Sequence, residues 1–187
     1  DFMAFSGHKM CGPTGVGVLY GKYKLLEITD PFMLGGGSNA RFDICGNILL
    51  KKPPFKFEAG TPAIEAVLGF HEAVKYLQNV GFDFIEKRER ELHDYLVGKM
   101  KELDHIVIYN EHSDTGIVTF NVKDVFAQDA ASYLSSKGIA VRAGNHCAKI
   151  LVNLLNTSET LRASLYFYNT KNDVDYLIKA LKDKEAI

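Results

Sequence analysis

The chain has 187 residues, of which 47% are hydrophobic and 24% are charged, and its formal net charge at pH 7 is −1. These ordinary globular values exclude a disordered chain, a collagen-like chain and a coiled coil, and the balanced charge gives no indication of a nucleic-acid partner. No uncharged stretch approaches the roughly 18 residues that a membrane helix needs, so we expect no membrane partner.

The cysteines bear on the redox compartment. Cys11, Cys45 and Cys147 are odd in number, widely spaced and without a C-x-x-C pair. This pattern is neither a disulfide framework nor a zinc-ligand spacing, so we expect a cytoplasmic protein with no metal site. The sequence opens at Asp1 directly in an apolar, strand-like segment, and we therefore expect it to be a piece of a longer protein.

The first 60 residues are predicted to form strands and connections. We expect strands over 1–6 and 15–20, joined by a turn-rich loop over 7–14. Glycines within the second strand indicate a close approach of another backbone. The glycine- and proline-containing stretch 31–60 predicts an irregular, extended connection.

Two helices follow. Thr61 is expected to cap the first helix with Pro62 at its first helical position, and the apolar spacing continues until Gly81. The second helix is predicted from Phe82 to about Leu103. Its charged run over 86–91 is interpreted as a solvated face rather than a binding patch.

The remaining elements alternate between strands and helices. We expect strands over 105–109 and 116–122, a helix over 128–136, a strand around 139–142, a loop containing Cys147, a strand around 161–166 and a final helix from 172 to about 184. This β-β-α-β-β-α order fits an α+β domain with helices on one side of a mainly antiparallel sheet. We therefore divide the chain into residues 1–60, strands of a larger domain, and residues 61–187, a small domain with its linking helix.

Lys9 is the first candidate for chemistry, since it follows a strand and precedes a glycine-rich loop. A free lysine has a pKa of about 10.4 and is almost fully protonated at pH 7. Nearby cations or a pocket without water lower the pKa of a lysine and so allow it to form a Schiff base. A solvated loop lysine is the alternative.

Cys147 is the second candidate, in a polar loop between Arg142 and His146 on one side and Ala148 on the other. Nearby cations raise the thiolate fraction of a cysteine, and these two side chains could supply the charge. A half-buried structural cysteine is the alternative. Cys11 and Cys45 lack comparable neighbours and are interpreted as structural.

Two weaker features of the sequence suggest sites that bind anions. Arg162 lies at the edge of an apolar strand, where its planar guanidinium suits a carboxylate, although a surface arginine is the plainer interpretation. The glycine run 35–37 and the helix start at Gly60-Thr61 suggest a phosphate site. The sequence contains no P-loop, dinucleotide fingerprint, serine elbow or H-E-x-x-H motif.

Four spaced motifs together resemble a known family. They are S-G-H-K-M-C-G-P-T-G-V-G-V-L-Y at 6–20, F-E-A-G-T-P at 57–62, V-R-A-G-N-H-C-A at 141–148 and R-A-S-L-Y-F-Y-N-T at 162–170. The first resembles the cofactor-lysine signature of class V aminotransferases, and the set resembles the C-terminal half of a SufS-type (group II, NifS-like) cysteine desulfurase. The resemblance implies an α/β fold, namely the C-terminal part of the type I pyridoxal-phosphate-dependent transferase fold: the last strands of the large domain and the small α+β domain.

The resemblance implies pyridoxal 5'-phosphate as the cofactor. Lys9 would hold it covalently and afterwards move protons. Ser6 and His8 would touch its phosphate, and Gly60 and Thr61 would reach the phosphate in the partner subunit of a homodimer. The aspartate that pairs with the pyridine nitrogen, and the side chain that stacks on the ring, would belong to an N-terminal half outside this sequence.

The resemblance also implies the reaction. Cys147 would attack the sulfur of L-cysteine, leaving a persulfide for a sulfur-acceptor protein in iron–sulfur cluster assembly and releasing L-alanine. Arg162 would bind the substrate carboxylate, and Arg142 and His146 would line the pocket. Relatives commonly have a second histidine where this chain has Asn145.

Two alternatives remain open. A selenocysteine lyase would use the same residues, and turnover of the two substrates separates the activities. The isolated chain could also be an inactive dimerisation or acceptor-docking module, and we expect it to bind pyridoxal phosphate weakly or not at all.

Overall fold

The computed structural model describes residues 1–183 and residue 187. The chain divides into two compact units, Asp1–Val80 and Gly81–Ile187. The sequence-based boundary after residue 60 lies one helix earlier, because the first unit also includes the helix that follows it. No helix among the described residues is both long and apolar enough to cross a membrane.

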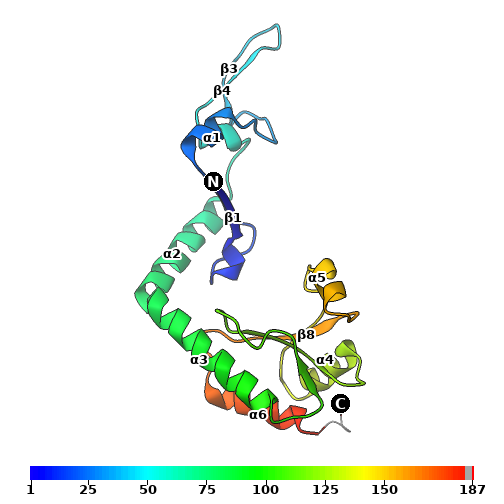
Figure 1. Ribbon diagram of the computed structural model, residues 1–187. Helices are drawn as coiled ribbons and strands as arrows, with labels where there is room; N and C mark the ends of the chain where they lie inside the picture. The colour runs from blue at the N-terminus through cyan, green and yellow to red at the C-terminus, as the bar shows by residue number, and fades with distance from the viewer. Residues whose placement is uncertain (184–186) are drawn as a thin grey trace. The chain divides into compact units, whose positions relative to one another are not determined.

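The first unit contains two separate β-hairpins and two α-helices. Its elements are β1 (Phe2–Ser6), the 3₁₀ turn η1 (Gly7–Lys9), β2 (Gly17–Gly21), α1 (Tyr23–Ile28), β3 (Asn39–Phe42), β4 (Ile48–Leu50), η2 (Phe55–Phe57) and α2 (Ile64–Val80). Strands β1 and β2 pair antiparallel, as do β3 and β4, which are labelled in Figure 1. Both strands expected in the first 20 residues are therefore present.

The hairpin β3–β4 lies where the sequence predicts irregular structure. Asp43 forms its turn: Oδ1 accepts hydrogen bonds from the backbone N–H groups of Cys45 at 2.9 Å and Asn47 at 3.0 Å. Hydrogen bonds from Asn47 lower the pKa of this exposed carboxyl. A short side-chain-directed turn thus pairs two strands that lack a clear alternating pattern.

Helix α2 begins later than predicted. It starts at Ile64, so Thr61 does not cap it and Pro62 is not its first residue. The backbone N–H of Gly37 donates to the carbonyl of Ala59 at 3.0 Å. This tertiary bond holds the preceding chain outside the helix, which overrides the local capping signal.

The second unit is an α+β domain, as predicted. Its elements are α3 (Phe82–Met100), β5 (Ile106–Ile108), β6 (Ile117–Val122), α4 (Ala127–Ser136), β7 (Arg142–Gly144), α5 (Lys149–Leu154), β8 (Thr160–Ser164) and α6 (Lys171–Leu181). The sheet has the order β5-β6-β8-β7, and all neighbouring strands are antiparallel.

Several boundaries in this unit differ from the sequence analysis. The strand expected around 139–142 instead begins at Arg142, and the region expected to be a loop around Cys147 continues into the short helix α5. The last helix ends at Leu181, and its predicted end at residue 184 lies outside the described residues.

One face of the sheet forms the core. In β6, Val118, Phe120 and Val122 are buried, whereas Thr119 and Asn121 between them are only partly so. Buried residues of α3, α4 and α6 pack against this face, among them Leu92, Leu96, Met100, Ala130, Leu134, Val174 and Leu181. The predicted placement of helices on one side therefore holds for these three helices, and polar side chains occupy the other face.

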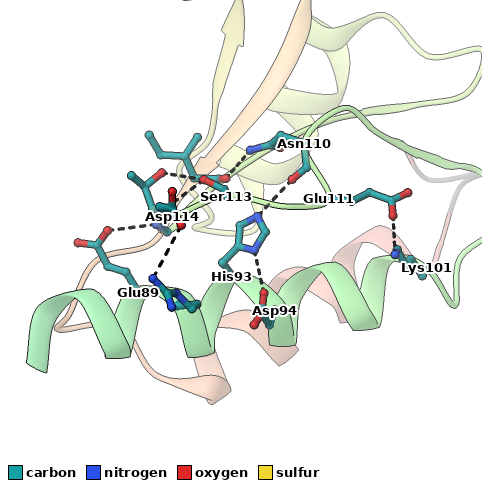
Figure 2. A network of polar contacts seen from close by, with 12 residues as sticks. Glu89, His93, Asp94, Lys101, Asn110, Glu111, Ser113 and Asp114 are labelled. Carbon is teal, nitrogen blue, oxygen red and sulfur yellow. Dashed lines mark hydrogen bonds and ion pairs between the residues drawn. The ribbon is translucent and has the colours of Figure 1, made fainter. Parts of the chain in front are cut away.

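A polar network ties α3 to the segment between β5 and β6 (Figure 2). The wholly buried ring of His93 places Nε2 3.2 Å from the carbonyl oxygen of Asn110. The Asn110 amide accepts from Thr119 N at 2.7 Å, and Glu89 accepts from Gly116 N at 3.1 Å. The charged run of α3 is thus mostly exposed, but Glu89 within it also fixes the start of β6.

The core face predicts the mutational sensitivity of this unit. Phe120→Ala removes a wholly buried ring and is expected to lower the free energy of unfolding by about 3–5 kcal/mol. Thr119→Ala, on the opposite face of the same strand, is the matched control and should cost much less. Urea denaturation followed by circular dichroism measures both, and equal losses would contradict the assignment of faces.

Candidate functional site

The loop that carries Lys9 is closed by the β1–β2 ladder. Ser6 lies opposite Gly17, and the N–H of Gly7 donates to the carbonyl of Val16 at 2.9 Å. Lys9 ends the 3₁₀ turn and is exposed, and its amine makes no hydrogen bond or ion pair with any described residue. The hairpin therefore presents a free amine at a fixed place.

Glycines make this closure possible. A Cβ at Gly12 would lie 2.8 Å from the carbonyl oxygen of Gly7 and 2.7 Å from Cδ2 of Phe70. A Cβ at Gly17 would lie 2.9 Å from the carbonyl oxygen of Phe5. The close backbone approach predicted for this strand is confirmed at Gly17, and any side chain at these positions would displace the loop.

The glycine run at 35–37 has a packing role. A Cβ at Gly35 or Gly37 would collide with the carbonyl oxygens of Ala59 or Glu58. The run thereby lies against the segment that leads to Gly60 and Thr61, both of which are exposed. Thr61 lies three residues before α2, so it offers no helix N-terminus to an anion, and its contact with a phosphate stays a prediction.

The second cluster is built on the β7–β8 ladder. The register places Arg142 opposite Arg162 and Gly144 opposite Thr160. A guanidinium nitrogen of Arg142 lies 3.9 Å from Sγ of the exposed Cys147. The structure therefore places Arg162, which the sequence indicated separately, opposite the arginine that lies beside Cys147.

His146 is bound within the same cluster. Its Nε2 lies 3.1 Å from the carbonyl oxygen of Thr160 and 2.9 Å from the Thr160 hydroxyl. Since a carbonyl only accepts, Nε2 carries the proton and Nδ1 has the lone pair. Burial lowers the pKa of His146, and the positive charge of Arg162 lowers it further, while the Thr160 bond opposes the shift. The imidazole is therefore neutral at pH 7.

The backbone at this point is strained. His146 has φ +52° and Cys147 φ +62°, and a left-handed conformation costs roughly 1–2 kcal/mol per L-residue. Such strain is found where surrounding contacts fix a functional geometry. It gives the Cys147 thiol a defined, exposed position.

Arg162 has an unsatisfied donor. Its Nε is buried and has no hydrogen-bond partner among the described residues. A buried polar group of this kind requires a partner, and a planar guanidinium is suited to a carboxylate. This geometry supports the predicted role in binding a substrate carboxylate.

The residues of the Lys9 loop fit pyridoxal phosphate. A Schiff base forms at a lysine side-chain nitrogen, and the exposed Lys9, which has no bond to a described residue, leaves that nitrogen accessible to the cofactor. Ser6, which ends β1, and the exposed His8 in the turn that follows have the donors that a phosphate accepts from.

Thr160 and Asn121 belong to the site but were missed by the sequence analysis. Thr160 is wholly buried and binds His146, while Asn121 of β6 binds the carbonyl of Glu159 at 2.9 Å. The only sequence signal is a polar residue within an otherwise apolar strand pattern, which also fits a solvent-facing position.

The effect of the Arg162 charge on the pKa of His146 can be tested. Proton NMR titration should show the His146 pKa below its ordinary value of 6.5, with the signal assigned through His146→Asn. Arg162→Gln should raise that pKa, because it removes a nearby positive charge, whereas Arg90→Gln on α3 should leave it unchanged. An unaltered titration in Arg162→Gln would contradict the proposed proximity.

The lowered pKa of His146 also determines whether folding stability rises or falls with pH. The unfolded chain binds this proton more readily than the folded one, so the contribution of His146 to stability is complete above about pH 6.5. This contribution is lost as the pH falls from about 6.5 to below the pKa that His146 has in the folded chain.

Comparison with known proteins gives three findings. The model of the family described as aminotransferase class-V matches residues 1–177. The probable cysteine desulfurase of Halalkalibacterium halodurans is 47% identical over 188 residues, covering 99% of this chain and 46% of the relative. The probable cysteine desulfurase of Staphylococcus aureus strain COL is 48% identical over 187 residues, covering 97% of this chain and 44% of the relative.

A solved structure agrees with these relatives. The crystal structure of the cysteine desulfurase CsdA from Escherichia coli, in an S-sulfonic acid form, has a TM-score of 0.94 and 37% identity, and covers 99% of this chain and 46% of that one. The fold is therefore that of part of a cysteine desulfurase. The chain spans about half the length of the relatives it matches.

Proposed function

Since this chain belongs to the aminotransferase class-V family, we propose that it is the C-terminal part of a pyridoxal-phosphate-dependent cysteine desulfurase. One observation carries the proposal: Cys147 is exposed on a strained loop, with the Arg142 guanidinium 3.9 Å from its sulfur. The names of the two bacterial relatives support the same activity.

Lys9, Ser6 and His8 are the residues that hold the cofactor in this proposal. Pyridoxal phosphate supplies the electron sink that makes the carbon–sulfur bond of the substrate breakable. The Lys9 amine binds it covalently, and the hydroxyl and imidazole bind its phosphate. Gly60 and Thr61 contact the phosphate of a second subunit, so the complete enzyme is a homodimer.

Cys147 and the two arginines act on the substrate. Arg162 binds the carboxylate of L-cysteine and orients its sulfur. The Cys147 thiolate attacks that sulfur, so a sulfur–sulfur bond forms as the carbon–sulfur bond breaks. The electron pair of the broken bond stays with the carbon skeleton, which takes up a proton and leaves as L-alanine. Arg142 and the neutral His146 line the pocket, where the guanidinium stabilises negative charge on sulfur.

The fate of the persulfide is part of the proposal. An exposed sulfur on a loop is accessible to an outside thiol, which supports transfer to an acceptor protein for iron–sulfur cluster assembly, as in SufS-type enzymes. The three cysteines are all free, which supports a cytoplasmic location. Because the relatives are about twice as long, we propose that these 187 residues alone are inactive.

The nucleophile is tested in the complete polypeptide that contains this chain. Cys147→Ser is expected to lower sulfide release from L-cysteine by at least about 100-fold, because a serine hydroxyl is a poor nucleophile toward sulfur. Cys45→Ser, which removes another exposed thiol, should retain the wild-type rate. Comparable losses in both variants, or none in Cys147→Ser, would refute the assignment.

The cofactor lysine is tested by a mass measurement. After borohydride reduction of the complete polypeptide, the cofactor should be found attached to the peptide that contains Lys9. Lys9→Ala is expected to abolish this adduct, and Lys24→Ala, at an exposed site on α1, should keep it. Recovery of the adduct from Lys9→Ala would show that another residue holds the cofactor.

A further inference from the structure

The conformation of the Cys147 loop depends on a residue outside that loop. His146 and Cys147 are both left-handed, which L-residues maintain only when their surroundings require it. Within the loop, the N–H of Ala148 donates to the carbonyl of Asn145 at 2.7 Å. Among the described residues, the only hydrogen-bond partner of the His146 ring is Thr160.

Thr160 is placed to hold that ring. It is wholly buried at the start of β8, and the ladder sets it opposite Gly144, two residues before His146. Its carbonyl and its hydroxyl both lie within hydrogen-bond distance of the same nitrogen, at 3.1 Å and 2.9 Å. The strand therefore offers one ring nitrogen two adjacent acceptors.

Asn121 fixes Thr160 from the neighbouring strand. The Asn121 amide donates to the carbonyl of Glu159 at 2.9 Å and accepts from the N–H of Leu161 at 3.2 Å. These are the two residues that flank Thr160. A continuous set of bonds thus runs from β6 through Thr160 to the loop of the cysteine.

We propose that Thr160 is a positioning residue for Cys147: by binding His146 it holds the left-handed pair and so keeps the thiol exposed beside Arg142. The inference rests on the proposed function, in that Cys147 is taken as the nucleophile. Thr160 itself touches neither the sulfur nor the substrate in this proposal. Without its hydroxyl, the loop relaxes toward ordinary backbone conformations and the sulfur leaves the guanidinium.

Thiol reactivity tests the proposal in the 187-residue chain, without cofactor or substrate. Each cysteine is alkylated with iodoacetamide, and peptide mass spectrometry follows the rates. Cys11 and Cys45 are also exposed and serve as internal references, since general unfolding would change all three rates. Thr160→Val should lower the rate at Cys147 relative to Cys45 by about threefold or more, the scale of one lost hydrogen bond.

Two further variants separate positioning from packing. Thr160→Ser keeps the hydroxyl and should restore the relative rate to within about twofold. Thr115→Val removes an exposed hydroxyl elsewhere in the unit and should leave it unchanged. An unchanged or increased rate in Thr160→Val, a failure of Thr160→Ser to restore it, or an equal loss in Thr115→Val would each overturn the proposal.

The tautomer of His146 gives a second measurement that needs no Thr160 variant. Nitrogen-15 NMR of the wild-type chain should show Nε2 protonated and Nδ1 unprotonated. A ring whose Nε2 takes part in no hydrogen bond would overturn the proposal even if Thr160→Val did not fold. Since neither measurement involves turnover, their outcome is distinguishable from a failure of the proposed function, which sulfide release in Cys147→Ser decides.

Discussion

The antiparallel pairing of β8 with β7 is the constraint on which the candidate site depends. It sets Arg142 opposite Arg162 and Gly144 opposite Thr160, and the loop of Cys147 leaves β7 directly after this pair. Because side chains alternate along a strand, a slip of one residue would exchange Arg162 with the buried Leu161. The other face of the sheet packs on α3, α4 and α6, and this packing fixes the register of β7 with β8. The hydrophobic core therefore positions Arg142 and Arg162.

The site concentrates positive charge. Like charges directly opposite each other in a sheet are destabilising, and the buried Nε of Arg162 lacks a partner among the described residues. The same charge helps to keep His146 neutral. An anionic ligand offsets both costs, which agrees with the proposed binding of a carboxylate by Arg162.

The two candidate residues Lys9 and Cys147 are presented by similar means in the two units. Lys9 follows a hairpin strand and stands on a turn that glycines allow to close tightly. Cys147 follows β7 and stands on a turn with successive left-handed residues. In both cases the backbone is fixed by bonds to an adjacent strand, while the side chain remains exposed. Rigid backbone with an accessible functional group reduces the entropy lost on reaching the reactive geometry.

The sequence by itself determined the order of elements in the second unit apart from the short helix α5, and it indicated the candidate residues Lys9, Cys147 and Arg162, because periodicity and motif spacing are local properties. It did not determine the hairpin β3–β4, the start of α2 at Ile64 or the role of Thr160. The hairpin depends on the turn that Asp43 forms with Cys45 and Asn47. The other two depend on contacts between residues distant along the chain, Gly37 with Ala59 and His146 with Thr160. A threonine has the same local propensity whether it faces solvent or binds a buried imidazole. Only the tertiary structure decides between the two, because burial and the partner both come from other strands.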